Sequence, residues 1–377
     1  MGVDHQELTD MIDNLIKGDQ YSVTQDEKER YLLSILKPLI TTVAHGCPPY
    51  GRFMARLGDA PEEWRGIADI PPLPVRVFKS MDLQAVPKEN IVRVLQSSST
   101  TDQSPSRIYL DKTTAFRQAR ALAAVLKEHI GKLRRPFLVI DEESSWGHGD
   151  EITARGAAIR GVANFASETV FALRKTEDGD IEPDFRLIEE FLSVNRDRPV
   201  LAFGFTYIVW SRFLQKALEQ GLKYESPKAI LLHSGGWKKL VSEAVSKEVF
   251  SEKASAIIGC HKSSILDFYG MVEQVGTVFV DCCEGNKHAP AFADVLIRRP
   301  DTFGEVAFGE EGIIEVVSSL PTSYPGQVLL TEDKGVLMGS DDCPCGRKGN
   351  YFRFTSRIER AEIRGCGDTF AEVQTLG

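Results

Sequence analysis

Short apolar runs that alternate with helical patterns fill the middle of the chain, and they constrain its fold more than any other feature. These runs span residues 137–140, 199–205 and 229–232. Between them, apolar residues recur three or four positions apart, as at Phe185, Ile188, Phe191 and Leu192. A chain that alternates strand and helix in this way builds a mainly parallel sheet covered by helices. We therefore expect an α/β fold over residues 91–275.

The sequence changes character on either side of this α/β part. Residues 1–90 carry amphipathic segments and include a Pro-rich stretch at 71–74 that must run extended. Towards the C-terminus, short β-like runs follow one another closely and are joined by Gly, Pro and Asp turns. We expect a helical N-terminal region at 1–90 and a small β-rich part at 276–355, which complete one domain of residues 1–355. The remaining residues, 356–377, are too few to form a domain alone.

Charge and composition exclude several classes of protein. The 377 residues include 45 Lys and Arg against 54 Asp and Glu, and the net charge of −9 opposes binding to nucleic acid or anionic lipid. No stretch approaches the roughly 18 apolar residues of a membrane helix, and the N-terminus lacks the pattern of a signal peptide. The seven cysteines are odd in number and scattered, apart from the pairs 282/283 and 343/345. We expect a cytoplasmic protein with reduced thiols, no nucleic-acid partner and no membrane span.

Five consecutive hydroxyl residues open the segment SSSTTDQSPS. They are Ser97, Ser98, Ser99, Thr100 and Thr101. A strand pattern precedes the segment and a helical pattern follows it, so we expect a loop between a strand and a helix. Such a loop can surround a triphosphate with hydroxyl and backbone N–H donors, aided by the positive end of the helix. The segment lacks the glycines and lysine of a Walker loop. Taken alone, a segment of this composition is more often a polar loop on the surface.

A second segment places paired glycines at the end of a strand. The apolar run 229–232 is soon followed by Ser234, Gly235 and Gly236, ahead of a helical pattern. Glycines have no side chain, so a flat ring can lie against the backbone at this point. A simple strand-to-helix turn gives the same pattern and is the more common explanation when the segment is taken alone.

The third segment, DFYGMVEQVG, holds an aromatic ring, a glycine turn and a carboxylate. Tyr269 can stack on a base, Gly270 makes the turn, and Glu273 can face a magnesium ion that bridges phosphates. Taken alone, ordinary packing of the ring and a solvated acid explain these residues equally well.

Thiols and an imidazole gather in and around the β-rich part. Cys283 and His288 are five residues apart, and Cys343 and Cys345 flank a single residue. Three thiolates and one imidazole suit a tetrahedral zinc ion with no open position, so the metal would be structural. Cys282 could take the place of Cys283. A partly occupied site and plain buried thiols remain alternatives.

The order of these segments resembles that of the adenylate-forming superfamily. Its members carry a Ser/Thr-rich phosphate loop, a Gly-rich adenine strand end, Tyr-Gly-x-x-Glu, an Asp that binds the ribose, and an Arg-rich hinge. In this chain Glu332 or Asp333, then Arg357, then Arg364 continue the series. The resemblance implies that the first three segments, Asp333, Arg357 and Arg364 bind ATP.

Two finer features narrow the resemblance. The Cys-x-Cys-Gly-Arg at 343–347 is similar to the phenylacetate-CoA ligase branch, whereas the Arg-Gly-Cys-Gly at 364–367 is similar to acyl-protein synthetases of the LuxE type. The second likeness spans nearly the whole chain. It implies the large domain of an adenylate-forming enzyme, with helix-covered sheets, a small β-rich subdomain, and the mobile C-terminal domain reduced to a tail at 356–377.

The resemblance also implies an activity. A fatty acid would be activated by ATP and Mg²⁺ to acyl-AMP, with Glu273 as the magnesium ligand and Cys366 as the nucleophile that takes the acyl group. Arg364 would favour the thiolate form of Cys366. The partner would be an acyl reductase or an acyl carrier. Two alternatives stand beside this one: a carboxylate or aryl-CoA ligase with coenzyme A as acceptor, and an inactive subunit that docks on a reductase.

Overall fold

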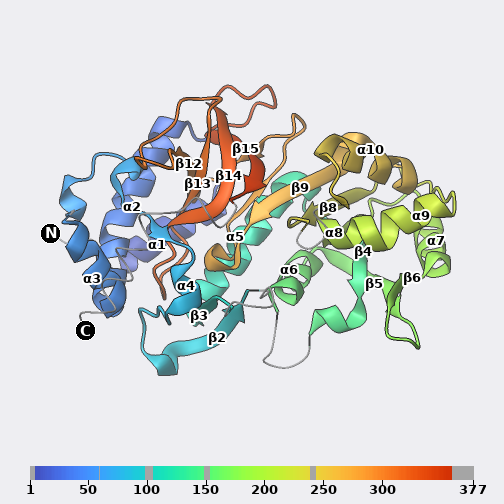
Figure 1. Cartoon of the computed structure of the whole chain (residues 1–377), viewed down its shortest axis with the longest axis horizontal. Helices are drawn as coiled ribbons and strands as arrows, with labels where there is room; N and C mark the ends of the chain where they lie inside the picture. The colour runs from blue at the N-terminus through green and yellow to red at the C-terminus, as the bar shows by residue number, and fades with distance from the viewer. Residues whose placement is uncertain (1–4, 59, 98–104, 148–152, 238–242, 359–377) are drawn as a thin grey trace. The chain divides into compact units, whose positions relative to one another are not determined.

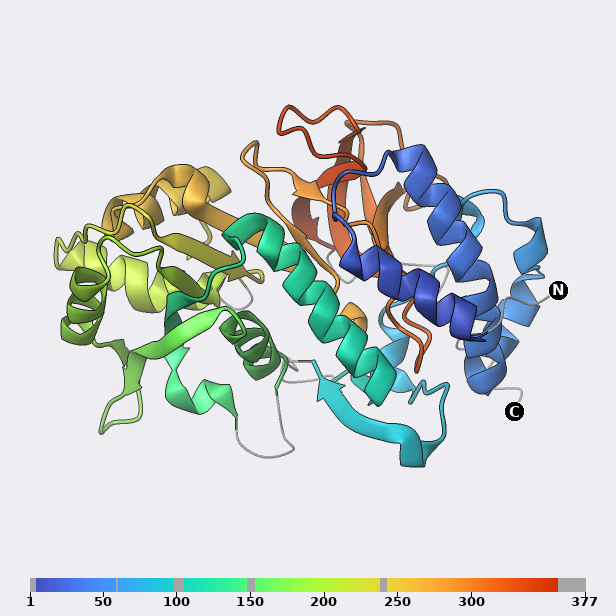
Figure 2. The same ribbon diagram turned by 180° about the vertical axis from the view of Figure 1, so that it is seen from behind.

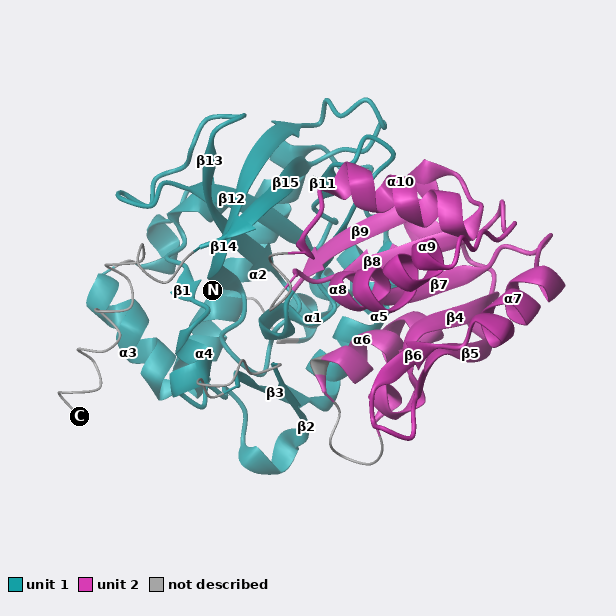
Figure 3. Cartoon of the chain, turned by 45° about the vertical axis from the view of Figure 1, so that its right-hand side comes forward, with its two compact units in different colours: residues 1–125, 271–377 teal, residues 126–270 magenta. Residues whose placement is uncertain are grey.

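The computed structural model describes residues 5–58, 60–97, 105–147, 153–237 and 243–358. The chain divides into two compact units, of which unit 1 comprises Met1–Val125 with Met271–Gly377 and unit 2 comprises Leu126–Gly270 (Figures 1 and 3). Unit 2 is thus an insertion between the two segments of unit 1. Among the helices that the structure describes, none combines the length and hydropathy needed to cross a membrane.

Unit 2 is built around a mainly parallel sheet. Its strands lie in the order β9-β8-β7-β4-β5-β6, and neighbouring strands are parallel except for β5 and β6. The strands are β4 Arg135–Glu142, β5 Ala166–Lys175, β6 Ile181–Pro183, β7 Leu201–Phe205, β8 Ile230–Ser234 and β9 Ile265–Gly270. The helices are α6 Ala154–Ala163, α7 Phe185–Val194, α8 Thr206–Ile208, α9 Gln215–Glu219 and α10 Lys247–Ile258, with a π-helical turn at Val209–Leu214.

The predicted apolar runs become the buried strands of unit 2. All three lie in or overlap β4, β7 and β8, whose side chains are almost entirely shielded from solvent. Helix α7 begins after Asp184, whose carboxylate accepts a hydrogen bond from the N–H of Leu187. Its Ile188, Phe191 and Leu192 then pack into the core of the unit, as their helical spacing requires. The α/β prediction is confirmed for this part of the chain.

Unit 1 contains a separate antiparallel sheet. Its strand order is β11-β15-β14-β13-β12, and β1 pairs with β14 in the parallel sense. These strands are β1 Leu73–Pro74, β11 Lys287–His288, β12 Ala293–Arg298, β13 Glu311–Ser318, β14 Val328–Ser340 and β15 Asn350–Arg357. Unit 1 also contains the short β10, Val278–Val280, which is not part of this sheet. The β-rich part expected towards the C-terminus is therefore present, and the second half of the Pro-rich stretch, Leu73–Pro74, forms the strand β1.

Helices of the N-terminal region pack on this sheet within unit 1. Figure 2 shows α1 and α2 in front of the antiparallel strands, and the long α2 buries an apolar face that includes Leu32, Ile35 and Leu39. The helices are α1 His5–Lys17, α2 Gln25–Gly46, α3 Pro48–Leu57, α4 Val77–Ser80 and α5 Lys112–Ile130, the last of which runs across the boundary into unit 2.

The hydroxyl-rich segment connects two strands, which corrects the expectation of a strand followed by a helix. β2 (Ile91–Gln96) and β3 (Arg107–Asp111) form an antiparallel ribbon, and α5 begins only after β3. In β3, Ile108 and Leu110 are buried and alternate with polar neighbours. This short alternation is the signature of a half-buried strand, but the polar residues around it mask the signal in the sequence.

Candidate functional site

Glu273, the acid predicted to face magnesium, is deeply buried in unit 1. It lies in the 3-10 turn η8 (Val272–Gln274) and is only 6% exposed. The Tyr324 hydroxyl donates a hydrogen bond to the Glu273 carbonyl oxygen at 2.9 Å. The Gln274 side-chain amide donates to the carbonyl oxygen of Gly326 at 2.8 Å. These contacts hold the backbone of the turn from both sides, so the fold fixes the point from which the Glu273 side chain extends.

Gly276 ends the same turn in a conformation that excludes other residues. Its φ is +88°, and a Cβ atom at this position would lie 2.5–2.9 Å from backbone atoms of Gln118 in α5. Only glycine combines the left-handed backbone with such a close approach. The segment that carries Glu273 therefore packs directly on the backbone of α5.

The Glu273 carboxylate lacks full compensation for its burial. Burial raises its pKa above the ordinary value, while the Ser106 hydroxyl and the charges of Lys79 and Arg357 oppose the rise. A buried carboxylate in this condition is stabilised by any cation that binds it. Divalent cations such as Mg²⁺ prefer oxygen ligands of this kind. The surroundings of Glu273 thus fit its predicted role as a magnesium ligand.

Asp333 and Arg357, predicted to bind ribose and phosphate, face each other across two strands of unit 1. They are register partners on β14 and β15, and Nε of Arg357 lies 3.4 Å from Oδ1 of Asp333. The Arg357 side chain is 74% exposed, whereas that of Asp333 is mostly buried. The N–H of Asp333 also donates to the Thr331 hydroxyl at 3.1 Å. The hairpin therefore presents a fixed carboxylate beside an exposed cation.

Two cations that were not singled out in the sequence lie in the same unit. Arg76 and Lys79 belong to α4 and its N-terminal boundary, directly after β1. Nη2 of Arg76 lies 2.8 Å from Oε1 of Glu332, and Nζ of Lys79 lies 3.5 Å from Oε2. Burial would raise the pKa of Glu332, but Lys79, Arg76 and Arg357 outweigh this effect and the pKa is lowered. The sequence feature that could have indicated these two residues is an Arg and a Lys three positions apart after an extended segment.

Lys79→Met should slow the acyl-AMP formation that the motifs predict by about tenfold, the effect of ~1.4 kcal/mol. The charge of Lys79 reaches Glu273, so its loss lowers the positive potential where phosphate charge would collect. The measurement is ATP–pyrophosphate exchange in the presence of the acid. Lys88→Met, at an exposed lysine of the turn Lys88–Asn90, is the matched control. Equal exchange rates for Lys79→Met and the wild type would contradict the role of this cation.

The segments predicted to bind the base lie at neighbouring strand ends in unit 2. Ser234 ends β8, and its hydroxyl donates to a main-chain carbonyl oxygen of the adjacent β9 at 2.7 Å. Gly235 has a φ of +86°, and a Cβ on Gly236 would meet no atom within 4 Å. β9 ends with Tyr269 and Gly270. Ligands of open α/β sheets bind at the carboxyl ends of parallel strands, so this edge suits a base.

Some predicted residues lie outside the part of the chain that the structure describes. Ser97 is described: its hydroxyl accepts a hydrogen bond from the N–H of Ser106 at 2.9 Å, and its own N–H donates to the Ser106 carbonyl at 3.1 Å. These bonds close the base of the hydroxyl-rich segment. The residues outside the described ranges are Ser98, Ser99, Thr100, Thr101, Arg364 and Cys366. Their roles stay predictions.

A cluster of thiols and an imidazole forms in unit 1, with one change from the predicted set. The ligand atoms of Cys282, His288, Cys343 and Cys345 all lie within 4.8 Å of one another. Cys283 is exposed instead, and its thiol lies 3.8 Å from a carboxylate oxygen of Glu284. Cys282 opens a tight turn in which the N–H of Gly285 donates to the Cys282 carbonyl oxygen at 2.9 Å, and Cys283 lies within this turn, where its side chain is exposed. The choice of Cys283 is corrected to Cys282, the alternative.

The imidazole of this cluster is held in the neutral state. Burial lowers the pKa of His288 to about 4, and the charges of Arg347 and Lys28 act in the same direction. The ring stacks on Tyr351, with 5.2 Å between centroids, and meets Tyr21 edge-on at 6.1 Å. Neutral imidazole is the form of histidine that binds metals.

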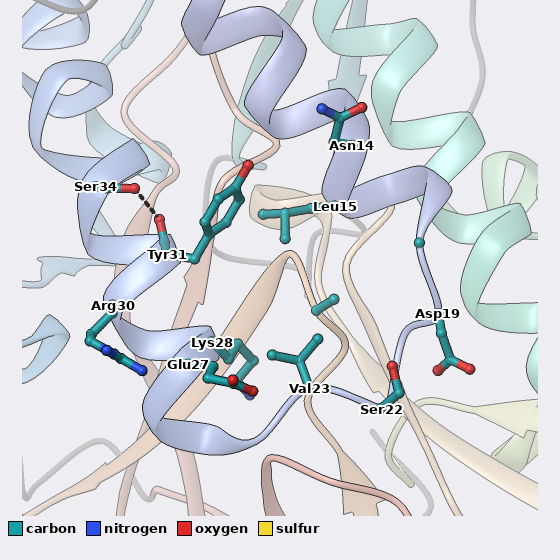
Figure 4. Close-up of a pocket in the computed structure, with 12 residues that line it drawn as sticks. Asn14, Leu15, Asp19, Ser22, Val23, Glu27, Lys28, Arg30, Tyr31 and Ser34 are labelled. Atoms are coloured by element: carbon teal, nitrogen blue, oxygen red, sulfur yellow. Dashed lines mark hydrogen bonds between the residues drawn. The ribbon is translucent and has the colours of Figure 1, made fainter.

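An open pocket of ≈ 570 Å³ lies elsewhere in unit 1 (Figure 4). It is formed by α1, α2 and the connection between them, together with Ala291, and Figure 4 shows Leu15 and Tyr31 pointing towards each other beside it. The lining residues include none of those predicted to bind ATP or a metal. We therefore do not assign this pocket to the nucleotide.

Comparison with solved structures defines the class of fold. The chain is similar to a 2-hydroxyisobutyryl-CoA ligase in an open conformation with 2-HIB-AMP and CoA, with a TM-score of 0.65 and 16% identity, covering 90% of this chain and 77% of that chain. The same enzyme in its postadenylation state gives a TM-score of 0.65 at 15% identity, covering 90% and 70%. These likenesses identify the fold as that of adenylate-forming ligases, and the predicted fold class is confirmed.

Sequence comparison then identifies the family. The family described as "Acyl-protein synthetase, LuxE" matches residues 1–375, and the chain belongs to this family of ligases. It is 22% identical over 310 residues to a long-chain-fatty-acid–luciferin-component ligase of Aliivibrio fischeri, which covers 81% of this chain and 79% of that protein. It is also 26% identical over 328 residues to a phenylacetate-coenzyme A ligase of Thermus thermophilus, covering 83% and 66%. Both resemblances predicted from the motifs are confirmed.

Proposed function

We propose that this ligase activates a long-chain fatty acid with ATP and transfers the acyl group to the thiol of Cys366. In the first step a carboxylate oxygen of the acid attacks the α-phosphorus, a new P–O bond forms, and pyrophosphate leaves. In the second step the Cys366 thiolate attacks the acyl carbon and AMP leaves. The printed name of the Aliivibrio fischeri relative supports a long-chain acid as the substrate.

One observation carries the first step of this proposal. Unit 1 combines the buried Glu273 carboxylate with the Asp333–Arg357 pair and with Lys79, whose charge acts on Glu273. Negative charge grows on the phosphate oxygens as pyrophosphate leaves, and fixed cations stabilise it. Bound Mg²⁺, held by Glu273, would add a further positive centre. Asp333 would accept hydrogen bonds from the ribose hydroxyls, and the exposed Arg357 would contact phosphate.

The remaining nucleotide contacts are assigned by motif and strand position. Tyr269 would stack on the adenine ring at the end of β9, while Ser234, Gly235 and Gly236 would let the base approach the neighbouring strand end. The hydroxyl-rich segment, whose base is closed by Ser97, would donate hydrogen bonds to the triphosphate. Arg364 would favour the thiolate of Cys366.

Cys366→Ala should abolish covalent acylation of the protein while acyl-AMP still forms. A thioester needs the sulfur nucleophile, whereas adenylation does not. The assay supplies labelled fatty acid, ATP and Mg²⁺, and it follows label on the protein after denaturing electrophoresis and acyl-AMP by chromatography. Cys283→Ala, at a cysteine that is exposed in the structure, is the matched control and should acylate normally. Undiminished acylation of Cys366→Ala, or loss of acylation in Cys283→Ala alone, would contradict the assignment.

A carboxylate–CoA ligase is the second candidate. The Cys-x-Cys-Gly-Arg motif at 343–347 and the phenylacetate-coenzyme A ligase of Thermus thermophilus, 26% identical, favour it. In that case coenzyme A would accept the acyl group, and acyl-CoA would appear equally with wild type and Cys366→Ala. In the lead proposal the thioester on Cys366 passes instead to an acyl reductase or an acyl carrier. Absence of AMP with every acid tested would indicate a subunit that only docks on a reductase.

A further inference from the structure

We propose that Cys282, His288, Cys343 and Cys345 bind one Zn²⁺ ion, and that this ion fastens the loop 343–349 on which the connection between α1 and α2 rests. The four side chains fill all four positions of a tetrahedral ion, leaving none for a substrate. The site is therefore structural. It is separate from the proposed adenylation chemistry, and it can be tested without any assay of that chemistry.

Two separations between ligand atoms are close to those of a tetrahedral zinc site, and all four atoms lie within 4.8 Å of one another. The Sγ atoms of Cys282 and Cys343 are 3.9 Å apart, and Sγ of Cys345 is 3.3 Å from Nε2 of His288. Bond lengths of about 2.3 Å for Zn–S and 2.0–2.1 Å for Zn–N place tetrahedral ligands about 3.8 Å apart for S–S and about 3.6 Å for S–N. A disulfide would need a separation of about 2.05 Å. Cys282 and Cys343 are thus spaced as two ligands of one ion rather than as a disulfide.

The three cysteines lie in two tight turns, and His288 lies on the strand β11. In the first turn, the N–H of Cys282 donates to the carbonyl oxygen of Asn286 at 2.8 Å. In the second, the N–H of Gly346 donates to the carbonyl oxygen of Cys343 at 2.9 Å, and Gly346 has a φ of +83°. The Asn286 side-chain amide also lies 3.6 Å from Sγ of Cys343 as a donor. Bonds of this kind orient the ligands and partly neutralise thiolate charge.

Burial and charge also favour an ion at this place. Cys282, His288 and Cys343 are each at most 5% exposed, so water does not compete freely for the site. Three thiolates around Zn²⁺ leave a net charge of −1. Arg347 follows the second turn, where its guanidinium lies 4.6 Å from the Tyr21 ring centroid. Its positive charge partly offsets the negative charge of the zinc–thiolate complex.

The loop that carries Cys343 and Cys345 supports the start of α2. The N–H of Lys348 donates to the carbonyl oxygen of Tyr21 at 2.9 Å. Asp341 accepts hydrogen bonds from the N–H of Gly349 at 2.7 Å and from the N–H of Gln25 at 3.0 Å. The Gln25 side chain in turn accepts from the N–H of Asn350 at 3.0 Å. Removal of the ion would loosen this loop and with it the α1–α2 connection.

Metal content provides the first test. The full chain, purified without chelators and freed of any histidine tag, should contain about one zinc per chain by elemental mass spectrometry. Cys282→Ser and Cys345→Ser should each lose most of this zinc, whereas Cys283→Ser should retain it because its sulfur is exposed outside the cluster. Zinc-free wild-type protein, equal loss from Cys283→Ser, or a Cys282–Cys343 disulfide found by peptide mapping would overturn the proposal.

Cobalt substitution tests the geometry of the metal site, and hydrogen exchange tests its effect on the loop 343–349. Both use wild-type protein, so they do not depend on whether a variant folds. Co²⁺ in place of zinc should give the intense visible bands of a tetrahedral site and the near-ultraviolet bands of thiolate ligands. Removal of zinc by a chelator should raise amide exchange in residues 18–28 and 343–350 and leave α7 in unit 2 unchanged. Octahedral cobalt spectra, or unchanged exchange in both segments, would overturn the proposal.

Discussion

Glu273→Gln will lower the rate of acyl-AMP formation by about 10²–10³-fold, the effect of removing one preorganised charge-stabilising group. The substitution keeps the shape of the side chain but removes the charge that would hold Mg²⁺. The turn should persist, because the Tyr324 hydroxyl bonds the backbone carbonyl of residue 273 rather than its side chain. The rate is measured by ATP–pyrophosphate exchange at several Mg²⁺ concentrations.

Glu284→Gln is the matched control for this charge removal. Glu284 is exposed in the same unit, so its loss should change the exchange rate less than twofold. A Glu273→Gln enzyme that keeps the wild-type rate and the wild-type Mg²⁺ dependence would refute the assignment of Glu273 as the magnesium ligand. A circular dichroism spectrum and unfolding midpoint near those of the wild type show that the comparison concerns folded protein.

The same substitution should not destabilise the protein at neutral pH, and it should change the pH dependence of stability. Burial raises the pKa of Glu273 in the folded state above its ordinary value of 4.5. The folded state therefore binds this proton more tightly than the unfolded state, and stability falls as pH rises from the unfolded to the folded pKa. Gln has no such dependence. Urea unfolding of both proteins from pH 4 to 8 without Mg²⁺ checks this, and a less stable variant above the folded pKa would contradict it.

Gly276→Ala should lower the free energy of unfolding by about 2–5 kcal/mol. An L-residue pays about 1–2 kcal/mol for the left-handed backbone at a φ of +88°. In addition, the new methyl group would overlap backbone atoms of Gln118 at 2.5–2.9 Å, and a backbone in the middle of α5 cannot move aside cheaply. Urea unfolding at equilibrium measures the difference.

Gly309→Ala separates the cost of the left-handed backbone from the cost of the steric overlap. Gly309 has a similar φ of +86°, but a Cβ atom there would meet no atom within 4 Å. This variant should therefore lose only the backbone component, about 1–2 kcal/mol. If Gly276→Ala and Gly309→Ala lowered the free energy of unfolding by the same amount, the steric overlap with α5 would not contribute to the loss of stability.

The helices and strands that were predicted correctly are those whose pattern of apolar residues lies within one short segment of the sequence. The strands of unit 2 appear as apolar runs because both faces of a parallel sheet are covered. The spacing of Ile188, Phe191 and Leu192 predicted the buried face of α7. Asp333 and Arg357 were predicted as partners in ATP binding from the order of motifs, and the β14–β15 register brings them together. In each case the decisive contacts follow from periodicity or from a motif.

Other features depend on contacts that one sequence does not display. The choice between Cys282 and Cys283 depends on the tight turn that begins at Cys282, which a single sequence does not display. Arg76 and Lys79 gain meaning only because Glu332, more than 250 positions away, lies beside them. The strand β3 was missed because only Ile108 and Leu110 point inward and polar residues flank them. Long-range contacts of this kind need three-dimensional coordinates.

The exposure of Cys283 affects how the proposed acyl-carrying cysteine can be tested in the laboratory. Among the cysteines that the structure describes, its sulfur is the one classed as exposed, while Cys47, Cys282 and Cys343 are buried. Maleimides and iodoacetamide will therefore alkylate Cys283 ahead of these buried neighbours. Alkylation of the protein by these reagents, even when enzyme turnover falls with it, does not show which cysteine sulfur would carry the acyl group. Tryptic peptides that retain the acyl adduct distinguish a bystander from a nucleophile.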